Sequence, residues 1–239
     1  MRLVSLLLVC ISCHAACARS ADSTSQRTLI ITPRFNSAGH FPFTGSLLHR
    51  HLNFDLNIFY EKGNYGFFLF KSVDWIEPRS YINYLQPGLF RKFELTTRWQ
   101  MRLFVGYLFS QTTGFIDKDS DYYTATTFYY AAHKNVRVEN TTLFYDVTQS
   151  GKIANRLLIA SRLKGFKIDL YLWHRWVLEQ ARHATSASLA LSLPEWRLHR
   201  AVSLAGSVSY QGYLTSSKPE YALRNGWLFS VAFPINVNP

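Results

Sequence analysis

Apolar and polar side chains alternate with a period of two along most of this chain, and this pattern constrains the fold more than any other feature. Between positions 51 and 61 every second residue is apolar: Leu52, Phe54, Leu56, Ile58 and Tyr60. The residues between them are polar apart from Phe59: Asn53, Asp55, Asn57 and Glu61. Because successive side chains of a strand point to opposite faces, the segment is predicted to be a strand with one apolar face.

The same alternation recurs to the C-terminal end of the chain. It predicts strands over 27–35, 50–61, 65–76, 80–86, 91–110, 121–132, 135–148, 154–164, 166–178, 184–193, 200–213 and 225–234. No amphipathic helical segment of useful length interrupts them. We therefore expect an all-β protein of about twelve strands, with boundaries uncertain by a few residues.

The connections between these segments alternate in length. Short turns are expected at 62–64, 87–90, 133–135 and 164–165, and longer stretches at 36–49, 111–120, 149–153, 179–183 and 214–223. Two joints fit this scheme badly, because 77–79 is short for a loop and 194–199 is long for a turn. Short turns at one end and longer loops at the other are typical of membrane β-barrels. The pattern predicts a closed antiparallel up-and-down transmembrane β-barrel with both termini at the short-turn end.

The first residues have the pattern of an export signal. Arg2 is followed by an apolar run from Leu3 to Ile11, and Ala16 and Ala18 fit a signal-peptidase site. The run is too short to span a bilayer, which takes about 20 residues. We expect residues 1–18 to be a cleaved signal peptide and residues 19–239 to form one barrel domain.

Two alternatives remain for this leader: lipidation at Cys17, or a buried N-terminal element. The cysteines (Cys10, Cys13 and Cys17) all lie in the leader, so the remaining chain cannot form disulfides.

Composition bears on which face of the strands meets which solvent. Charged residues make up only 17% of the chain, and aromatic residues make up 16%. Large aromatic side chains fall near strand ends, as in the girdles of membrane barrels: Tyr60, Trp75, Trp99, Tyr107, Phe109, Trp173, Trp176, Trp196 and Trp227. We therefore expect apolar faces toward lipid and polar faces toward the lumen. The alternative is a soluble exported barrel with the opposite orientation, which would bind a lipid or another small hydrophobic ligand.

The last strand carries a recognisable pattern: Arg224, Gly226, Phe229, Val231 and Phe233. It resembles the terminal-strand assembly signal of Gram-negative outer-membrane β-barrel proteins, although residues 234–239 follow where members of that class usually end. The resemblance implies an outer-membrane location and recognition by the barrel-assembly machinery.

The polar faces bring together a charged set of candidate pore-lining residues: Arg98, Arg102, Arg156, Arg162, Lys164, Lys167, Arg175, Asp55, Glu94 and Asp169. A passage lined with excess arginine would concentrate anions and retard cations. The hypothesis is a porin-like channel for small polar or anionic solutes, an architecture similar to that of small monomeric porins for acidic oligosaccharides. The alternative is a structural barrel whose lumen is plugged by ion pairs.

Other chemistry has weaker support in the sequence. His183, Thr185 and Ser186, or His49 and His51, could serve a barrel enzyme acting on lipid, which is a third hypothesis. Asp117, Asp119 and Asp121 resemble the start of a calcium loop, but Tyr122 stands where glycine is needed.

We expect no cofactor, no metal and no nucleic-acid partner. The net charge of +11 fits contact with outer-membrane lipid and the phosphates of lipopolysaccharide.

Overall fold

The computed structural model describes residues 27–41, 46–49, 51–76, 83–110, 120–148, 151–178, 182–217 and 225–237, and within these ranges it consists of strands joined by turns and loops. The strands are β1 (Arg27–Asn36), β2 (Gly39–Phe41), β3 (Ser46–His49), β4 (Asn53–Lys62), β5 (Tyr65–Asp74), β6 (Tyr84–Glu94), β7 (Trp99–Ser110), β8 (Asp121–His133), β9 (Val136–Tyr145), β10 (Lys152–Leu163), β11 (Phe166–Val177), β12 (Arg182–Ser192), β13 (Trp196–Arg197), β14 (Ser203–Ser216), β15 (Gly226–Ala232) and β16 (Ile235–Val237).

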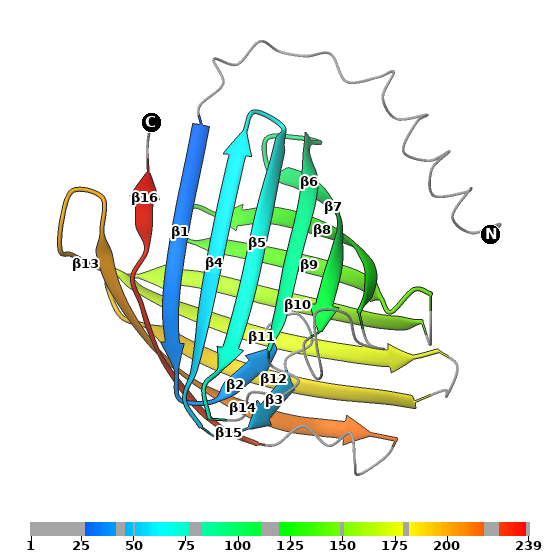
Figure 1. Ribbon diagram of the computed structural model, residues 1–239. Coiled ribbons are helices and arrows are strands. Elements are labelled where there is room, and N and C mark those ends of the chain that lie inside the picture. The colour runs from blue at the N-terminus through cyan, green and yellow to red at the C-terminus, as the bar shows by residue number, and fades with distance from the viewer. Residues whose placement is uncertain are drawn as a thin grey trace.

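The strands close into one barrel (Figure 1). Each strand of the wall pairs antiparallel with its neighbour in the chain, and β1 pairs with both β4 and β15. β16 continues β15 along β1, with a break at residues 233–234. With β15 and β16 counted as one strand, the wall has twelve strands, and the predicted closed up-and-down barrel is confirmed. Among the described residues there is no helix whose length and apolar character would let it cross a bilayer.

Two predicted strand boundaries are wrong. The sequence predicts a turn at 87–90 and one long strand over 91–110, whereas β6 runs through Pro87 and a turn at 95–98 leads into β7. Pro87 has no N–H to donate, and the pairing of β6 with β7 is interrupted between Leu85 and Gly88. The true turn is closed by Thr96, whose Oγ1 accepts from the backbone N–H groups of Arg98 (3.2 Å) and Trp99 (3.1 Å). The predicted connection at 77–79 is too short for a loop. Because β5 ends at Asp74 and β6 begins at Tyr84, the connection between them spans 75–83.

Most apolar side chains of the wall face outward and most polar ones inward, as predicted. Along β11, Ile168, Leu170 and Leu172 are each more than a third exposed, whereas Asp169 is buried. The inward positions that are buried are mostly polar, among them Asn53, Ser72, Gln86, Thr127 and Ser186. This arrangement is the reverse of a soluble barrel, which fills its interior with apolar side chains and exposes polar ones.

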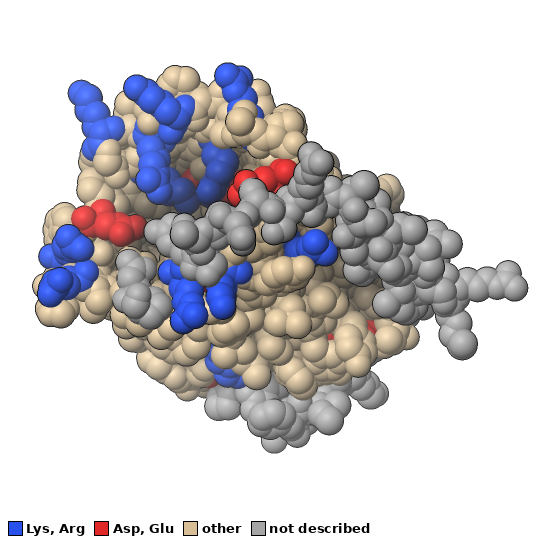
Figure 2. All heavy atoms as spheres, turned by 90° about the horizontal axis from the view of Figure 1, so that it is seen from above, with Lys and Arg blue, Asp and Glu red and all other residues tan. Residues whose placement is uncertain are grey.

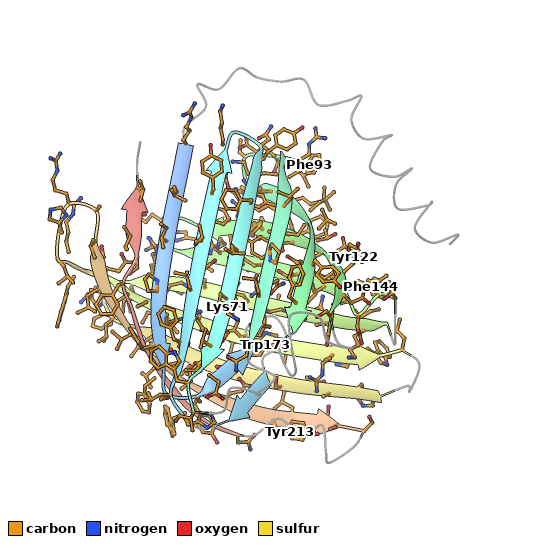
Figure 3. The ribbon with its side chains drawn as sticks, viewed as in Figure 1. Lys71, Phe93, Tyr122, Phe144, Trp173 and Tyr213 are labelled. Atoms are coloured by element: carbon orange, nitrogen blue, oxygen red, sulfur yellow. The ribbon has the colours of Figure 1, made fainter. Side chains whose placement is uncertain are left out.

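Trp173 and Lys71 are two of the residues that depart from the simple pattern. Trp173, predicted to lie in an aromatic girdle, faces inward and is only 3% exposed. It lies within the outline of the barrel, whereas Tyr122 and Phe144 lie at its edge (Figure 3). Lys71 lies on the outward face of β5, between Leu56 and Leu85 of the neighbouring strands. Its flexible stem allows the ammonium group to extend toward the polar end of the barrel.

Aromatic rings coat the inner surface of β4 to β9. Phe68, Phe90 and Tyr123 form a buried cluster with Phe59 and Phe104, and their rings contact one another at centroid distances of 5.1–6.3 Å. Three inward-facing glycines make room for these rings against the wall: Gly66, Gly88 and Gly106. A Cβ on Gly66 would collide with the Phe90 ring, and one on Gly88 would collide with the Tyr123 hydroxyl and the Phe68 ring. The rings therefore lie close against the wall.

A methyl group at Gly88 should lower the stability of the barrel. We expect Gly88→Ala to reduce the free energy of unfolding by about 1–3 kcal/mol, the usual cost of overpacking a filled site. Urea titration of the protein in lipid vesicles measures the change. Gly206→Ala is the control, because its Cβ would meet only Leu193 Cδ1, at 3.4 Å, an ordinary contact distance. Equal stability of the two variants would contradict the packing described.

Candidate pore lining

Five basic side chains gather on the inner surface of one side of the barrel. Lys92, Arg102, Arg137, Arg156 and Lys167 come from β6, β7, β9, β10 and β11, and the ladder registers turn all of them inward. We call this set the basic inner patch. Three acids lie among them, namely Glu61, Glu139 and Asp169, so the patch keeps an excess of positive charge.

The ion pairs of the patch run along the wall. Arg137 pairs with Glu139 of the same strand (2.5 Å), and Lys167 pairs with Asp169 of the same strand (2.7 Å). The longest reach among the described residues joins Arg102 of β7 to Glu61 of β4 (2.9 Å), three strand positions away. Opposite walls of a twelve-stranded barrel are six positions apart, so these pairs do not cross the lumen. The geometry disfavours a lumen plugged by ion pairs.

Arg102 is fixed in place by three aromatic rings as well as by Glu61. Its guanidinium carbon lies 5.5 Å from the Phe59 ring centroid and 5.2 Å from those of Phe90 and Tyr129. Glu61 also accepts from Lys92 Nζ at 2.8 Å, reaching across β5 where the inward residue is Gly66. Cation–π contact and pairing together hold a charged group at a defined position while leaving its side chain 20% exposed.

The wall on the other side is lined mainly by small side chains. The inward positions of β12, β14 and β15 include Ser186, Ser188, Ala190, Ser192, Ala205, Ser207, Ser209, Ser230 and Ala232. Asn57, an inward residue in the middle of β4, is exposed. Seen from the end where β4 turns into β5, Lys and Arg side chains surround a hollow (Figure 2). The side chains of the basic inner patch are partly exposed, from 15% at Lys92 to 54% at Arg137, so water reaches them.

A second polar cluster, which sequence reasoning missed, joins the first strands to the last. Asp55 accepts from Asn36 Nδ2 (2.7 Å), Asn53 Nδ2 (3.1 Å) and Ser72 Oγ (2.7 Å), and it lies 3.4 Å from Arg34. Asn36 accepts in turn from Ser230 Oγ of β15 at 2.6 Å. We call these residues the seam network, because they connect β15, β1, β4 and β5 where the barrel closes. The sequence shows only that these residues lie on a polar face of the strands, and this does not identify their hydrogen-bond partners.

The candidate pore-lining residues divide into three groups. Arg102, Arg156, Lys167 and Asp169 belong to the patch or pair with it, and Arg175 faces inward, half-buried, on β11. Asp55 faces inward but is buried in the seam network. The other four lie exposed at the turn end of the barrel: Glu94 and Arg162 at strand ends, and Arg98 and Lys164 in turns. Lys164 and Gly165 form a tight hairpin turn in which both residues have a positive φ.

The pattern of the last strand forms the closing edge of the barrel. Gly226, Phe229 and Val231 lie in β15, with Phe229 and Val231 exposed on the outer surface. The Phe233 N–H donates to the Pro33 carbonyl at 2.9 Å, at the break before β16. Arg224 lies outside the described residues.

The structure does not bring together the histidine and serine proposed for hydrolysis. His183 is exposed on the outer face of β12, whereas Ser186 faces inward and is fully buried. His174 of β11 instead shares a hydrogen bond of 2.8 Å with Thr185 and contacts the Trp176 ring edge-on.

The other predicted polar sites are only partly described. His51 bonds Asp74 at 2.7 Å, and His49 lies in β3. Asp117 and Asp119 lie outside the described residues, and Asp121 accepts from the backbone of Tyr122 and Thr148. In the part of the chain that the structure describes, no group of three or more His, Cys, Asp or Glu could hold a metal ion.

Comparisons with known proteins identify the fold but no family. No protein-family model matches the chain, and no curated protein matches it in sequence. Among solved structures, the NanC porin superimposes with a TM-score of 0.56 at 10% identity, covering 87% of this chain and 100% of that one. An outer membrane channel from Pseudomonas putida F1 gives 0.57 at 9% identity over 92% and 100% of the two chains. A mutant of the TodX monoaromatic hydrocarbon channel gives 0.51 at 7% identity over 91% of each. The chain thus has the barrel fold found in outer-membrane channels.

Removing Asp55 should destabilise the barrel at its seam. We expect Asp55→Ala to lower the free energy of unfolding by about 3–5 kcal/mol, because three buried polar side chains and the partly exposed Arg34 would lose their partner. Unfolding in urea from lipid vesicles gives the value. Glu94→Ala is the matched control: its carboxylate is 73% exposed and 4.0 Å from Lys92, so we expect little change. A similarly small effect at Asp55 would show that the network does not hold the seam.

Proposed function

We propose that this protein is an outer-membrane channel through which small polar and anionic solutes diffuse. The basic inner patch carries the proposal, because it places an excess of cationic groups on the surface of a water-accessible lumen. Positive groups beside low-dielectric walls raise the local concentration of anions. The guanidinium groups of Arg102 and Arg156 can each bind a carboxylate or phosphate through two parallel hydrogen bonds.

The same architecture supports a location in the outer membrane. A barrel with an apolar outer surface is stable only in a membrane, and the leader at 1–18 fits export and cleavage. Both ends of the barrel-forming chain, Arg27 and Val237, lie at the short-turn end, which in barrels of this kind is periplasmic. The pattern from Arg224 to Phe233 supports recognition by the barrel-assembly machinery, and membrane lipid and lipopolysaccharide are the expected surroundings.

The comparisons agree with a transport role. The NanC porin is described as a porin, and TodX as a channel for monoaromatic hydrocarbons. The hydrocarbon solutes of TodX are not carried over to this chain, because the solutes of this chain are inferred from its own basic inner patch. The solved neighbours are channels, and this supports the view that the protein is not an enzyme.

Planar-bilayer recording tests the proposal. The folded protein should give discrete conductance steps, and its reversal potential in a KCl gradient should show a preference for chloride. Absence of steps from heat-modifiable, folded protein would instead indicate a structural barrel, and a preference for potassium would contradict the role of the patch.

Neutralising two arginines of the patch should change selectivity. We expect Arg102→Gln with Arg156→Gln to lower the chloride-to-potassium permeability ratio by about two- to threefold, since both charges line the lumen. Arg98→Gln with Lys164→Gln removes the same charge from exposed turns outside the lumen and should leave the ratio nearly unchanged. An equal shift in both pairs would mean that overall charge, and not the patch, sets selectivity.

A further inference from the structure

Three basic residues and a tyrosine form one lateral row on the outside of the barrel at its turn end. The ladder registers place Arg27 beside Lys62, Lys62 beside Tyr65, and Tyr65 beside Arg91, across β1, β4, β5 and β6. These four strands lie side by side (Figure 1). Neighbouring strands are about 5 Å apart, so the row spans about 15 Å. We call it the outer basic row.

The row faces away from the lumen. The residues next to it along the strands turn inward, and Glu61, beside Lys62, binds Lys92 and Arg102 inside the barrel. Arg27 and Lys62 are exposed, and Tyr65 is 60% exposed. On the same outer face, toward the middle of the barrel, lie Leu29, Ile58, Phe67 and Leu89. The row therefore lies at the boundary of the apolar band.

Within the described part of the chain, the cations of this row have no anionic partner. Among the described residues, no ion pair involves Arg27, Lys62 or Arg91. The Arg91 guanidinium carbon lies 5.3 Å from the Tyr65 ring centroid and 4.8 Å from that of Phe93, and the buried Arg91 Nε has no hydrogen-bond partner. Ring contact orients the guanidinium group but satisfies none of its donors.

We propose that the outer basic row binds the phosphodiester headgroup of an anionic phospholipid. Phosphate oxygens would accept from the Arg91 fork and from Lys62 or Arg27, while the acyl chains would lie along the apolar rows below. The choice of a phospholipid rests on the proposed outer-membrane location, in which the turn end faces the periplasmic leaflet. Lipopolysaccharide would then occupy the opposite leaflet, near the loops.

Native mass spectrometry of the full chain in detergent, with phosphatidylglycerol or phosphatidylcholine of identical acyl chains, tests the site. The wild-type protein should retain about tenfold more phosphatidylglycerol than phosphatidylcholine. The variant Arg27→Gln, Lys62→Gln and Arg91→Gln should lose this preference. The matched control removes three turn-end charges outside the row, Lys134→Gln, Lys164→Gln and Arg197→Gln, and should keep it. Heat-dependent gel mobility verifies that each variant is folded, and Arg91→Gln alone, which should lose part of the preference, replaces the triple variant if that fails to fold.

Three results would overturn the proposal: equal retention of the two lipids by the wild type, an undiminished preference for phosphatidylglycerol in the row variant, or tighter binding of lipid A than of phosphatidylglycerol. The test is separate from that of the channel. Conductance recorded in phosphatidylcholine bilayers can fail while lipid retention persists, and lipid retention can fail in a protein that conducts with chloride preference.

Discussion

Closure of the hydrogen-bonded ladder is the constraint on which the rest of this structure depends. In hydrocarbon an unpaired backbone N–H or C=O costs several kcal/mol, so a sheet in a bilayer cannot keep free edges. Here β1 meets β15 and β16 to complete the circle, and Pro33 and Pro234 fall at the break between the last two segments. The seam network adds side-chain bonds at the same place, from Ser230 through Asn36 to Asp55 and Ser72. The buried carboxylate of Asp55, which the sequence alone predicts to line the pore, therefore stabilises the closure of the barrel.

Closure also decides what the interior can contain. With lipid outside, apolar side chains on the outer face contribute stability, and the inner face is free to carry charge. The aromatic layer over Gly66 and Gly88 occupies the wall between β4 and β9, and Arg102 packs on top of it. The small residues of β12, β14 and β15 keep the facing wall thin. The aromatic layer therefore supports Arg102 and holds its charge at the inner surface.

Much of this fold could be predicted because a period of two in the sequence shows which residues of a strand lie on the same face of the sheet. The existence of the strands follows from this period, whereas the direction of their faces follows from the low charge and the aromatic residues near strand ends. The errors lie where a local signal conflicts with tertiary pairing: Pro87 and Gly88 look like a turn but lie within a strand, and the turn at 95–98 contains no glycine or proline because Thr96 supplies the bonds. The place of Trp173 near a strand end predicts a girdle position, whereas its odd position in β11, shared with Asp169, puts it inside the barrel. Partners such as Asp55 with Asn36, or Arg91 with Tyr65, depend on registers that one sequence does not contain.

The orientation of β11 tests the central claim most directly. With Cys10, Cys13 and Cys17 removed, single cysteines at positions 168–173 can be spin-labelled and the protein reconstituted in a bilayer. Collision with oxygen, which concentrates in lipid, should be high at Ile168, Leu170 and Leu172 and low at Asp169, Tyr171 and Trp173. Accessibility to a water-soluble nickel chelate should be low at the first three positions. A reversed profile, or one without a period of two, would contradict a barrel that turns its apolar rows to lipid and its charges to the lumen.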